Sequence, residues 1–481
     1  MSLDMESFVL VLFVCSVLIV GSQGDLPDDA LIVHPMVLES REPSFEKLLV
    51  IHDGHSLKLT KASVLAEKLL LRDITDNGVI DRYVDGKVYE NELYQDSEQL
   101  ASLVVKPQSN GDYHIEGIVN STHFIRPILT SRRSLSGRTA HQLSRLEERK
   151  STHDIIRTSR RASQRGKRNE ETPLELPKNF TIEMVFISGF NHTKYFNNET
   201  DRINYVSVLM LGVGLRLQRL DPPGRIALTS IMGCTTTRDE NIFVSLSSDG
   251  FVLGGPTLTK MSNQVLRIIR AADMVYLATQ KSIRLADNSK NTNSTVLGLA
   301  GIGGACGKNK VAIGMDKPGT YSGLQTAPHE IGHLLGCNHD GETGSESCSG
   351  EEYIMRSHSG GKRHYEWSKC SKEAVKKFLR SSKSKCLHDI TNERYHIAVL
   401  PNKTVEVVTG INGQEYCQNY FPNYQNVTYF ETPETCRIYC KIVDSRNKSS
   451  LVGLFAPEGI PCNKDRPEMK CSRGTCWWPK P

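Results

Sequence analysis

The sequence predicts an α/β protein with a twisted, mostly parallel sheet, preceded by a cysteine-free block and followed by a cysteine-rich one. Strand and helix patterns alternate from residue 169 to about residue 390, which is typical of helices packed on a parallel sheet. The block before them, residues 25–168, contains no cysteine. The block after them, residues 391–481, has six cysteines in 91 positions and is expected to be a small disulfide-stapled domain. We call these the central, cysteine-free and cysteine-rich blocks.

Strands are predicted in the central block wherever a short apolar run is bounded by turn residues: 181–188, 225–233, 294–307 and 310–315. A helix is predicted over residues 198–217, although Gly212 and Gly214 weaken its second half. A stronger amphipathic helix is predicted over residues 257–280, because apolar residues recur there at three- and four-residue steps. All of these elements are expected to form the core.

The first 24 residues are predicted to be a signal peptide, so residues 1–24 would be absent from the secreted chain. Phe8–Val20 is an unbroken apolar run of thirteen residues, whereas a bilayer span needs about 20. Ser22 and Gly24 form a small-x-small cleavage site. No later segment resembles a membrane span, so we expect a secreted, extracellular protein.

Sequons and cysteines agree with secretion. Twelve cysteines lie from Cys234 to Cys476, which allows up to six disulfides. Candidate glycosylation sites occur in eight Asn-x-Ser/Thr sequons: Asn120, Asn179, Asn191, Asn198, Asn293, Asn402, Asn426 and Asn447.

A basic stretch closes the cysteine-free block. Residues 126–168 contain thirteen Lys and Arg against three acidic residues, so this stretch is expected to be a poorly ordered, solvated linker rather than a nucleic-acid-binding tail. It ends in Arg165-Gly166-Lys167-Arg168, which resembles a proprotein-convertase site. Residues 25–168 are therefore expected to be a propeptide that a convertase removes. Neither nucleic acid nor membrane is needed to explain the charge.

The stretch TAPHEIGHLLGCNHDG predicts a catalytic metal site. His329 and His333 are four residues apart and project from one face of a helix. Gly336 can take a positive φ and turn the chain, so that His339 becomes a third ligand. Three imidazoles leave one position of a zinc ion (Zn2+) for water, which Glu330 can reach as a general base. A histidine-rich helix end and an inactive relic of such a site are the alternatives.

This motif resembles the extended zinc signature of the metzincin proteases. Asp340 follows the third histidine directly, as in the reprolysin (adamalysin) branch. Met355 lies sixteen residues beyond His339 and resembles the methionine of the Met-turn, beneath the zinc site. Ala456–Trp477 is similar to the cysteine-rich domains of snake-venom and ADAMTS-type enzymes. The short tail is most like secreted salivary metalloproteases of ticks.

The resemblance implies a catalytic domain over residues 169–390, with a five-stranded sheet, an active-site helix, zinc ligands His329, His333 and His339, and catalytic Glu330. A substrate peptide would add as an antiparallel strand to Val296–Gly301, and residues 356–367 would wall the S1′ pocket.

By resemblance, Cys306 pairs with Cys386, and a calcium ion (Ca2+) binds near Glu183 and the residues after Cys386. The pairing of four further cysteines stays open: Cys234, Cys337, Cys348 and Cys370.

The implied function is that of a secreted, monomeric zinc endopeptidase of extracellular proteins. A tick-like salivary enzyme would suggest fibrinogen, fibrin or matrix proteins as substrates and impaired haemostasis as the result. The alternative is an adhesion-blocking or matrix-binding protein that acts through its cysteine-rich tail. One departure from the family is that residues 25–168 contain no cysteine to bind the zinc. We therefore expect latency by occlusion of the cleft or by a non-thiol ligand.

Overall fold

The computed structural model describes residues 30–388 apart from 40–45, 53–54, 76–77, 129–137, 148–151, 157–172, 269–271, 286–293, 351 and 359–362, and also 413–421, 426–430, 437–443, 449–455, 461, 468–472 and 475–477. The predicted signal peptide lies outside these residues, as do the processing site and three sequons: Arg165, Lys167, Arg168, Asn293, Asn402 and Asn447.

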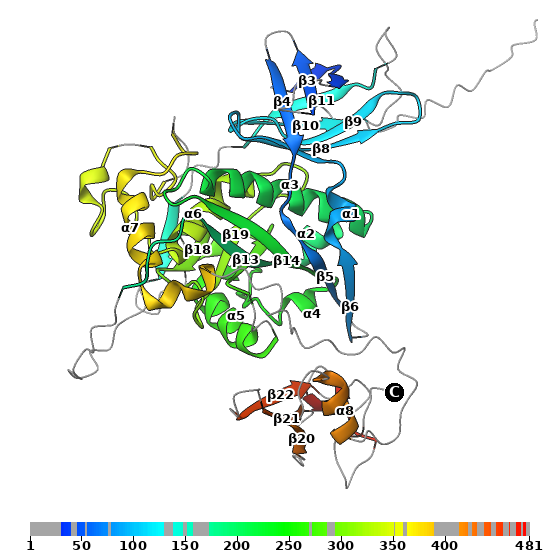
Figure 1. The fold of residues 1–481 in the computed structure, drawn as a ribbon, viewed down its shortest axis with the longest axis vertical. Helices are drawn as coiled ribbons and strands as arrows, with labels where there is room; N and C mark the ends of the chain where they lie inside the picture. The colour runs from blue at the N-terminus through cyan, green and yellow to red at the C-terminus, as the bar shows by residue number, and fades with distance from the viewer. Residues whose placement is uncertain are drawn as a thin grey trace, which may run out of the picture.

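A ten-stranded sheet forms the centre of the molecule (Figure 1). Its strands are β5 (Leu65–Thr75), β6 (Gly78–Asp85), β12 (Thr152–Ile156), β13 (Phe180–Ser188), β14 (Gly224–Cys234), β15 (Val252–Leu253), β16 (Met274–Thr279), β17 (Ile283–Arg284), β18 (Thr295–Gly301) and β19 (Val311–Met315). The order is β15-β17-β18-β19-β16-β13-β14-β5-β6, and β12 pairs with β18. β13 runs parallel to β14 and β16, and β16 to β19, which confirms the mostly parallel α/β prediction.

The expected number of five strands is wrong for the sheet as a whole. The central block supplies the series β18-β19-β16-β13-β14, but β5 and β6 of the cysteine-free block continue the sheet beyond β14. β12 of the same block pairs with β18 near the opposite side. The cysteine-free block is therefore not structurally separate. Its strands pair with β14 and β18, which would otherwise present more unpaired backbone groups.

Helices cover both faces of this sheet (Figure 1). α3 (Glu199–Leu217) and α6 (Gly323–Leu334) pack with Met184 and Phe186 of β13 in one core. α5 (Gly254–Ile268) packs with the alternate residues Val185 and Ile187 in a second core. Successive side chains of a strand point to opposite faces, so one apolar strand serves both cores. The shorter helices are α1 (Gly86–Glu90), α2 (Phe190–Lys194), α4 (Thr237–Glu240) and α7 (Lys369–Leu379).

The helix predicted over residues 257–280 is wrong in its C-terminal part. α5 ends at Ile268, and Met274–Thr279 form β16, in which every residue is buried. A strand that is buried on both faces has no alternation of polar and apolar residues, so its apolar run continued the helical pattern. The helix over 198–217 is confirmed, because α3 passes through both glycines without a break. A Cβ atom on Gly212 would lie 2.9 Å from Leu324 Cδ1, so this glycine allows α3 and α6 to pack closely.

The cysteine-free block also forms a nine-stranded sheet, in the order β1-β11-β10-β9-β8-β7-β4-β3-β2. Its strands are β1 (Leu31–Val33), β2 (Met36–Glu39), β3 (Lys47–His52), β4 (His55–Lys61), β7 (Leu93–Asp96), β8 (Ala101–Pro107), β9 (Tyr113–Ile118), β10 (His123–Pro127) and β11 (His141–Arg145). The expectation of poor order across 126–168 is wrong for β11, where four of five residues are buried. β11 lies between β10 and β1, and its Leu143 joins the apolar core of this sheet.

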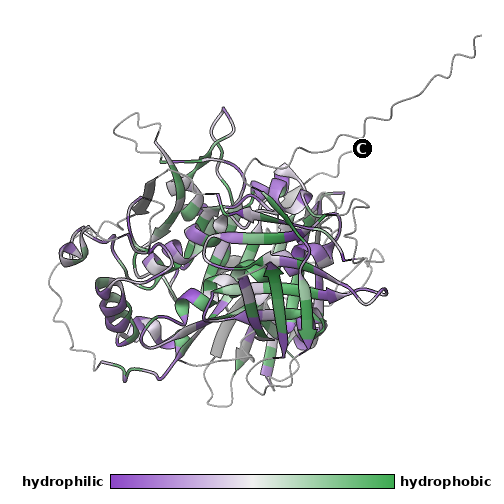
Figure 2. Cartoon of the chain, turned by 90° about the horizontal axis from the view of Figure 1, so that it is seen from above, coloured by the Kyte–Doolittle hydropathy of each residue, from purple (hydrophilic) through white to green (hydrophobic). Residues whose placement is uncertain are grey.

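The described parts of the cysteine-rich block comprise α8 (Gly413–Tyr420), the three-stranded sheet β20 (Asn426–Phe430), β21 (Arg437–Val443) and β22 (Ser449–Phe455), and the hairpin β23 (Lys470–Ser472) and β24 (Thr475–Trp477). A disulfide between Cys417 and Cys440 joins α8 to β21. Figure 2 shows hydrophobic residues gathered in the strands at the centre of the molecule and hydrophilic residues on peripheral helices and turns. Within the described residues, no helix is long and apolar enough to cross a membrane.

Candidate metal and catalytic site

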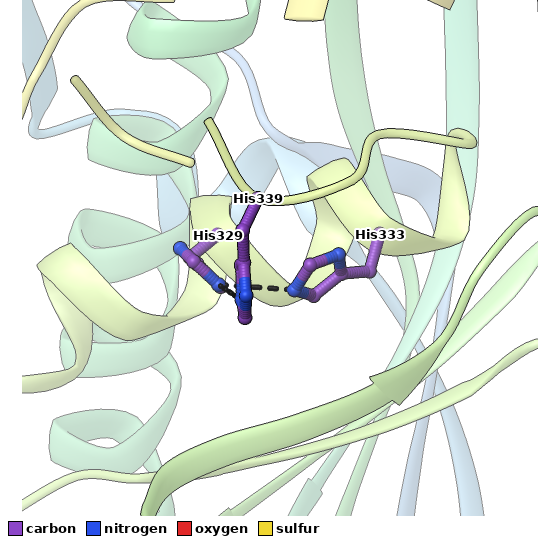
Figure 3. A group of neighbouring side chains, drawn as sticks. All are labelled: His329, His333 and His339. Carbon is purple, nitrogen blue, oxygen red and sulfur yellow. Dashed lines mark hydrogen bonds between the residues drawn. The ribbon is translucent and has the colours of Figure 1, made fainter. Parts of the chain in front are cut away.

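Three histidine side chains converge on one point (Figure 3). His329 and His333 lie on α6, and His339 follows the turn at Gly336, which has the positive φ expected of it, +97°. The Nε2 atom of His329 is 3.0 Å from that of His333 and 3.2 Å from that of His339. All three side chains are buried. The structure thus brings together the three residues that the sequence singled out.

The backbone fixes the orientation of two of these imidazoles. The Nδ1 atom of His329 donates to the carbonyl of Ile354 at 2.7 Å, and that of His333 donates to the carbonyl of Cys337 at 2.9 Å. A carbonyl can only accept, so in the neutral rings Nδ1 carries the proton and Nε2 presents a lone pair. Lone pairs that face each other at about 3 Å repel unless a cation lies between them. This donor set fits a zinc ion.

Glu342, which sequence reasoning missed, orients the third imidazole. Its Oε1 lies 3.1 Å from Nδ1 of His339. Carboxylates in this position hold a ligating ring in place and raise its basicity. In the sequence, the only sign of this contact is that Glu342 lies three residues after His339. That spacing is too common to identify a partner.

Glu330 is fully buried beside β18. A Cβ atom on Gly298 of that strand would lie 2.4 Å from Oε1 of Glu330 and 2.7 Å from Cγ2 of Thr326. Gly298 therefore leaves the space that the Glu330 carboxylate occupies. It too was missed, although an isolated glycine inside a strand pattern is typical of a close approach.

Replacing Gly298 by alanine is expected to lower kcat by roughly 10²-fold, because a displacement of the catalytic carboxylate by about 1 Å can cost that much. Gly301→Ala in the same strand is the control, since a Cβ atom there would meet nothing within 4 Å. The measurement is steady-state hydrolysis of a fluorogenic peptide together with zinc content. Equal kcat values for the two variants would contradict the assigned position of Glu330.

Met355 and Asp340 lie next to the three-histidine site and connect it to α6 and α7. Met355 is fully buried, and a Cβ atom on Gly332 of α6 would lie 2.5 Å from its sulfur. Met355 thus lies against the helix that carries the histidines, where the Met-turn prediction puts it. The backbone amide of Asp340 donates to the Met355 carbonyl at 2.8 Å, and its carboxylate accepts from Ser368 at the start of α7 at 2.6 Å. Burial raises the pKa of Asp340 to about 6.

Two disulfides are present in the central block. Cys306 is bonded to Cys386, the pair that the resemblance implied. Cys348 is bonded to Cys370, which is one of the pairings that the sequence left open. Both bonds join residues near the C-terminal end of the block to earlier segments.

Cys234 and Cys337 are free and buried, so their prediction as disulfide partners is wrong. Cys337 belongs to the core that contains α6, and Cys234 belongs to the core on the other face of the sheet. The sheet separates the two thiols. The Cys337 thiol instead donates to the carbonyl of Ser371 at 3.5 Å, and burial raises the pKa of both thiols.

The region expected to bind calcium holds two buried carboxylates, Glu183 and Asp273. Asp273 accepts from the backbone amide of Glu183 at 2.9 Å. The buried ammonium of Lys310 donates to the carbonyl of Ala272 and lies in the field of Asp273. That positive charge opposes a cation at this place, and residues 389–412 lie outside the described part of the chain. Calcium binding stays a prediction.

Five sequons lie in the described residues, and glycosylation at each stays a prediction. Asn179, Asn191, Asn198 and Asn426 are exposed, whereas Asn120 is partly buried. Asn198 also caps α3, because its side-chain oxygen accepts from the backbone amide of Asp201.

Comparisons with known proteins agree with this geometry. Residues 257–391 match the family described as Reprolysin (M12B) family zinc metalloprotease. The chain is 28% identical to Venom metalloproteinase BumaMPs1 of Olivierus martensii, over 64% of this chain and 79% of that protein. It is 23% identical to Venom metalloproteinase antarease TserMP_A of Tityus serrulatus, over 79% of this chain and 98% of that protein. It is also 28% identical to human A disintegrin and metalloproteinase with thrombospondin motifs 13, over 43% of this chain and 14% of that protein.

The α/β fold and the three-histidine site define a zinc metalloendopeptidase of the metzincin class. Within that class, residues 257–391, which carry the site, match the reprolysin branch, and the chain is similar to venom metalloproteinases. The likeness to salivary enzymes of ticks stays a prediction.

Proposed function

We propose that this chain is a secreted endopeptidase of extracellular proteins, in which His329, His333 and His339 hold one catalytic zinc ion and Glu330 is the general base. The convergence of three Nε2 atoms, in rings whose Nδ1 atoms all face acceptors, carries this proposal. The predicted signal peptide and the venom metalloproteinases among the relatives support secretion. Fibrinogen, fibrin and matrix proteins are the proposed substrate class.

A zinc ion at this site supplies Lewis acidity toward the scissile carbonyl and toward the attacking water. The carboxylate of Glu330 accepts a proton from that water as its oxygen bonds to the carbonyl carbon. When the carbon–nitrogen bond breaks, Glu330 returns the proton to the leaving amine. Glu330 is fully buried, so its carboxylate interacts more strongly with the charges of the site than it would in bulk water.

The domain boundaries belong to this proposal: a signal peptide at residues 1–24, a propeptide at 25–168, a catalytic domain at 169–390 and a cysteine-rich domain at 391–481. A proprotein convertase would cleave after Arg168, and the processed enzyme would act as a monomer. Residues 356–367 would line the S1′ pocket.

We also propose that β12 keeps the precursor inactive by occlusion of the cleft. β12 pairs with β18 in parallel, with Thr152 opposite Val296 and Ile156 opposite Gly301. A substrate would bind the same edge in the antiparallel direction. β12 would therefore occupy the substrate edge with reversed chain polarity, which explains how latency arises without a propeptide cysteine.

The test of the zinc endopeptidase is metal analysis combined with hydrolysis of a denatured protein. The processed enzyme should contain one zinc ion per chain, lose activity in 1,10-phenanthroline and regain it when zinc is added. His333→Ala should contain no zinc. Hydrolysis that persists without metal would contradict the proposal.

A further inference from the structure

A buried carboxylate connects the sheet to the start of the helix that carries the site. Asp316 directly follows β19 and is 1% exposed. Its Oδ1 accepts from the backbone amide of Gly323, the first residue of α6, at 2.7 Å, and from the hydroxyl of Ser322 at 3.3 Å. Its Oδ2 accepts from the hydroxyl of Tyr205 at 2.9 Å and lies 3.0 Å from Nε2 of His192. One side chain thus joins β19, α6, α3 and α2.

The Tyr205 hydroxyl is a second junction in this network. Besides donating to Asp316, it accepts from the backbone amide of Tyr321 at 3.0 Å. The rings of Tyr205 and Tyr321 stack, with centroids 4.5 Å apart and planes 12° from parallel. Tyr321 has a φ of +52°, in the left-handed region that non-glycine residues rarely adopt. Tyr205 therefore stabilises an unfavourable conformation in the loop that leads into α6.

His192 is the third residue of this network. It is fully buried in α2, and its Nδ1 lies 3.0 Å from the hydroxyl of Ser188 at the end of β13. Since a carboxylate oxygen is an acceptor, Nε2 of His192 carries the proton toward Asp316. The ring also packs against the rings of Phe186, Phe196 and Tyr205.

This network lies at the start of α6, the helix that carries most of the site residues. Ser322, at the N-cap of α6, makes no side-chain capping bond, so Asp316 supplies the acceptor for the first amide and the negative charge that a helix start favours. His329, Glu330 and His333 lie on α6, whereas His339 and β18 do not. A shift of α6 therefore changes the spacing of the ligands to one another and of Glu330 to the substrate edge.

We infer that His192, Tyr205 and Asp316 are positioning residues for the catalytic centre, whose buried hydrogen bonds hold α6 in register with His339 and β18. The inference rests on the proposed roles of the three histidines and Glu330. A positioning role differs from a general contribution to stability. It acts within the folded enzyme, where the geometry of the metal ligands and of the general base depends on where α6 begins.

The test compares Tyr205→Phe with Tyr321→Phe in the processed enzyme, residues 169–481. Tyr205→Phe removes the bridging hydroxyl and keeps the stacked ring. Tyr321→Phe is the matched control, because the Tyr321 hydroxyl is buried with no hydrogen-bond partner in the described part of the chain. We expect Tyr205→Phe to lower kcat and to accelerate zinc release to a chromophoric chelator, each by roughly 10- to 100-fold, with KM unchanged. Tyr321→Phe should match the wild type.

Three outcomes would decide the question. A lower melting temperature for Tyr205→Phe, with wild-type kcat and zinc release at 25 °C, would overturn the inference and leave a structural role. If Tyr205→Phe does not fold, His192→Gln and His192→Leu replace it: glutamine can still donate to Asp316, so it should retain more zinc and activity than leucine, and equal losses would overturn the inference. A wild-type enzyme without zinc would overturn the proposed function and the inference together.

Discussion

Glu330→Gln is expected to lower kcat by about 10²- to 10⁴-fold, the usual contribution of a general base. Glutamine has nearly the same shape and should fit beside Gly298, but its amide cannot accept the proton of the attacking water. The three imidazoles are unchanged, so zinc content and KM should stay close to those of the wild type. Metal analysis and steady-state kinetics on a fluorogenic peptide measure all three quantities.

Glu342→Gln is the matched control for that substitution. It also replaces a carboxylate within the site by an amide, but Glu342 faces Nδ1 of His339 rather than the substrate edge. The amide oxygen can still accept from the ring, so we expect zinc affinity to weaken by at most about 10-fold and kcat at saturating zinc to change little. Similar losses of kcat in both variants would remove Glu330 from the role of general base.

An uncleaved precursor that carries Arg168→Ala is expected to hydrolyse the same peptide at least about 10²-fold more slowly than the processed enzyme. The pairing of β12 with β18 is the reason, because a tethered strand reaches an effective concentration in the millimolar range and a micromolar substrate competes poorly with it. Release of β12 should therefore restore activity without cleavage. Adding Ile155→Pro tests this, since proline removes a backbone donor from the strand opposite Ala300.

Ser163→Pro in the same uncleaved precursor is the control, because it adds a proline outside β12 and before the processing site. We expect the precursor with Ile155→Pro to gain activity and the precursor with Ser163→Pro to stay inactive. Full activity of the Arg168→Ala precursor would reject occlusion. Sulfur ligation in zinc spectroscopy of the precursor would reject a thiol-free mechanism of latency.

Local spacing in the sequence predicted most of the metal centre. Two histidines four residues apart share one helix face whatever the rest of the fold does, and Gly336 had to take a positive φ for the third to reach them. The buried strands β13, β14, β18 and β19 were predicted for a similar reason, since each is a short apolar run bounded by turn residues. β16 was mistaken for helix because its apolar run continued the helical spacing of α5.

By itself, then, the sequence determined the class of enzyme and the three imidazoles, because these depend on residues within eleven positions of one another. Only the tertiary structure decided that Gly298 makes room for Glu330, that Cys337 and Cys234 stay free on opposite faces of a sheet, and that β12 pairs with β18. It also decided that Asp316 joins four elements at the start of α6. Each of these features depends on how segments far apart in the chain pack together, and no local periodicity encodes which distant side chain will fill a given space.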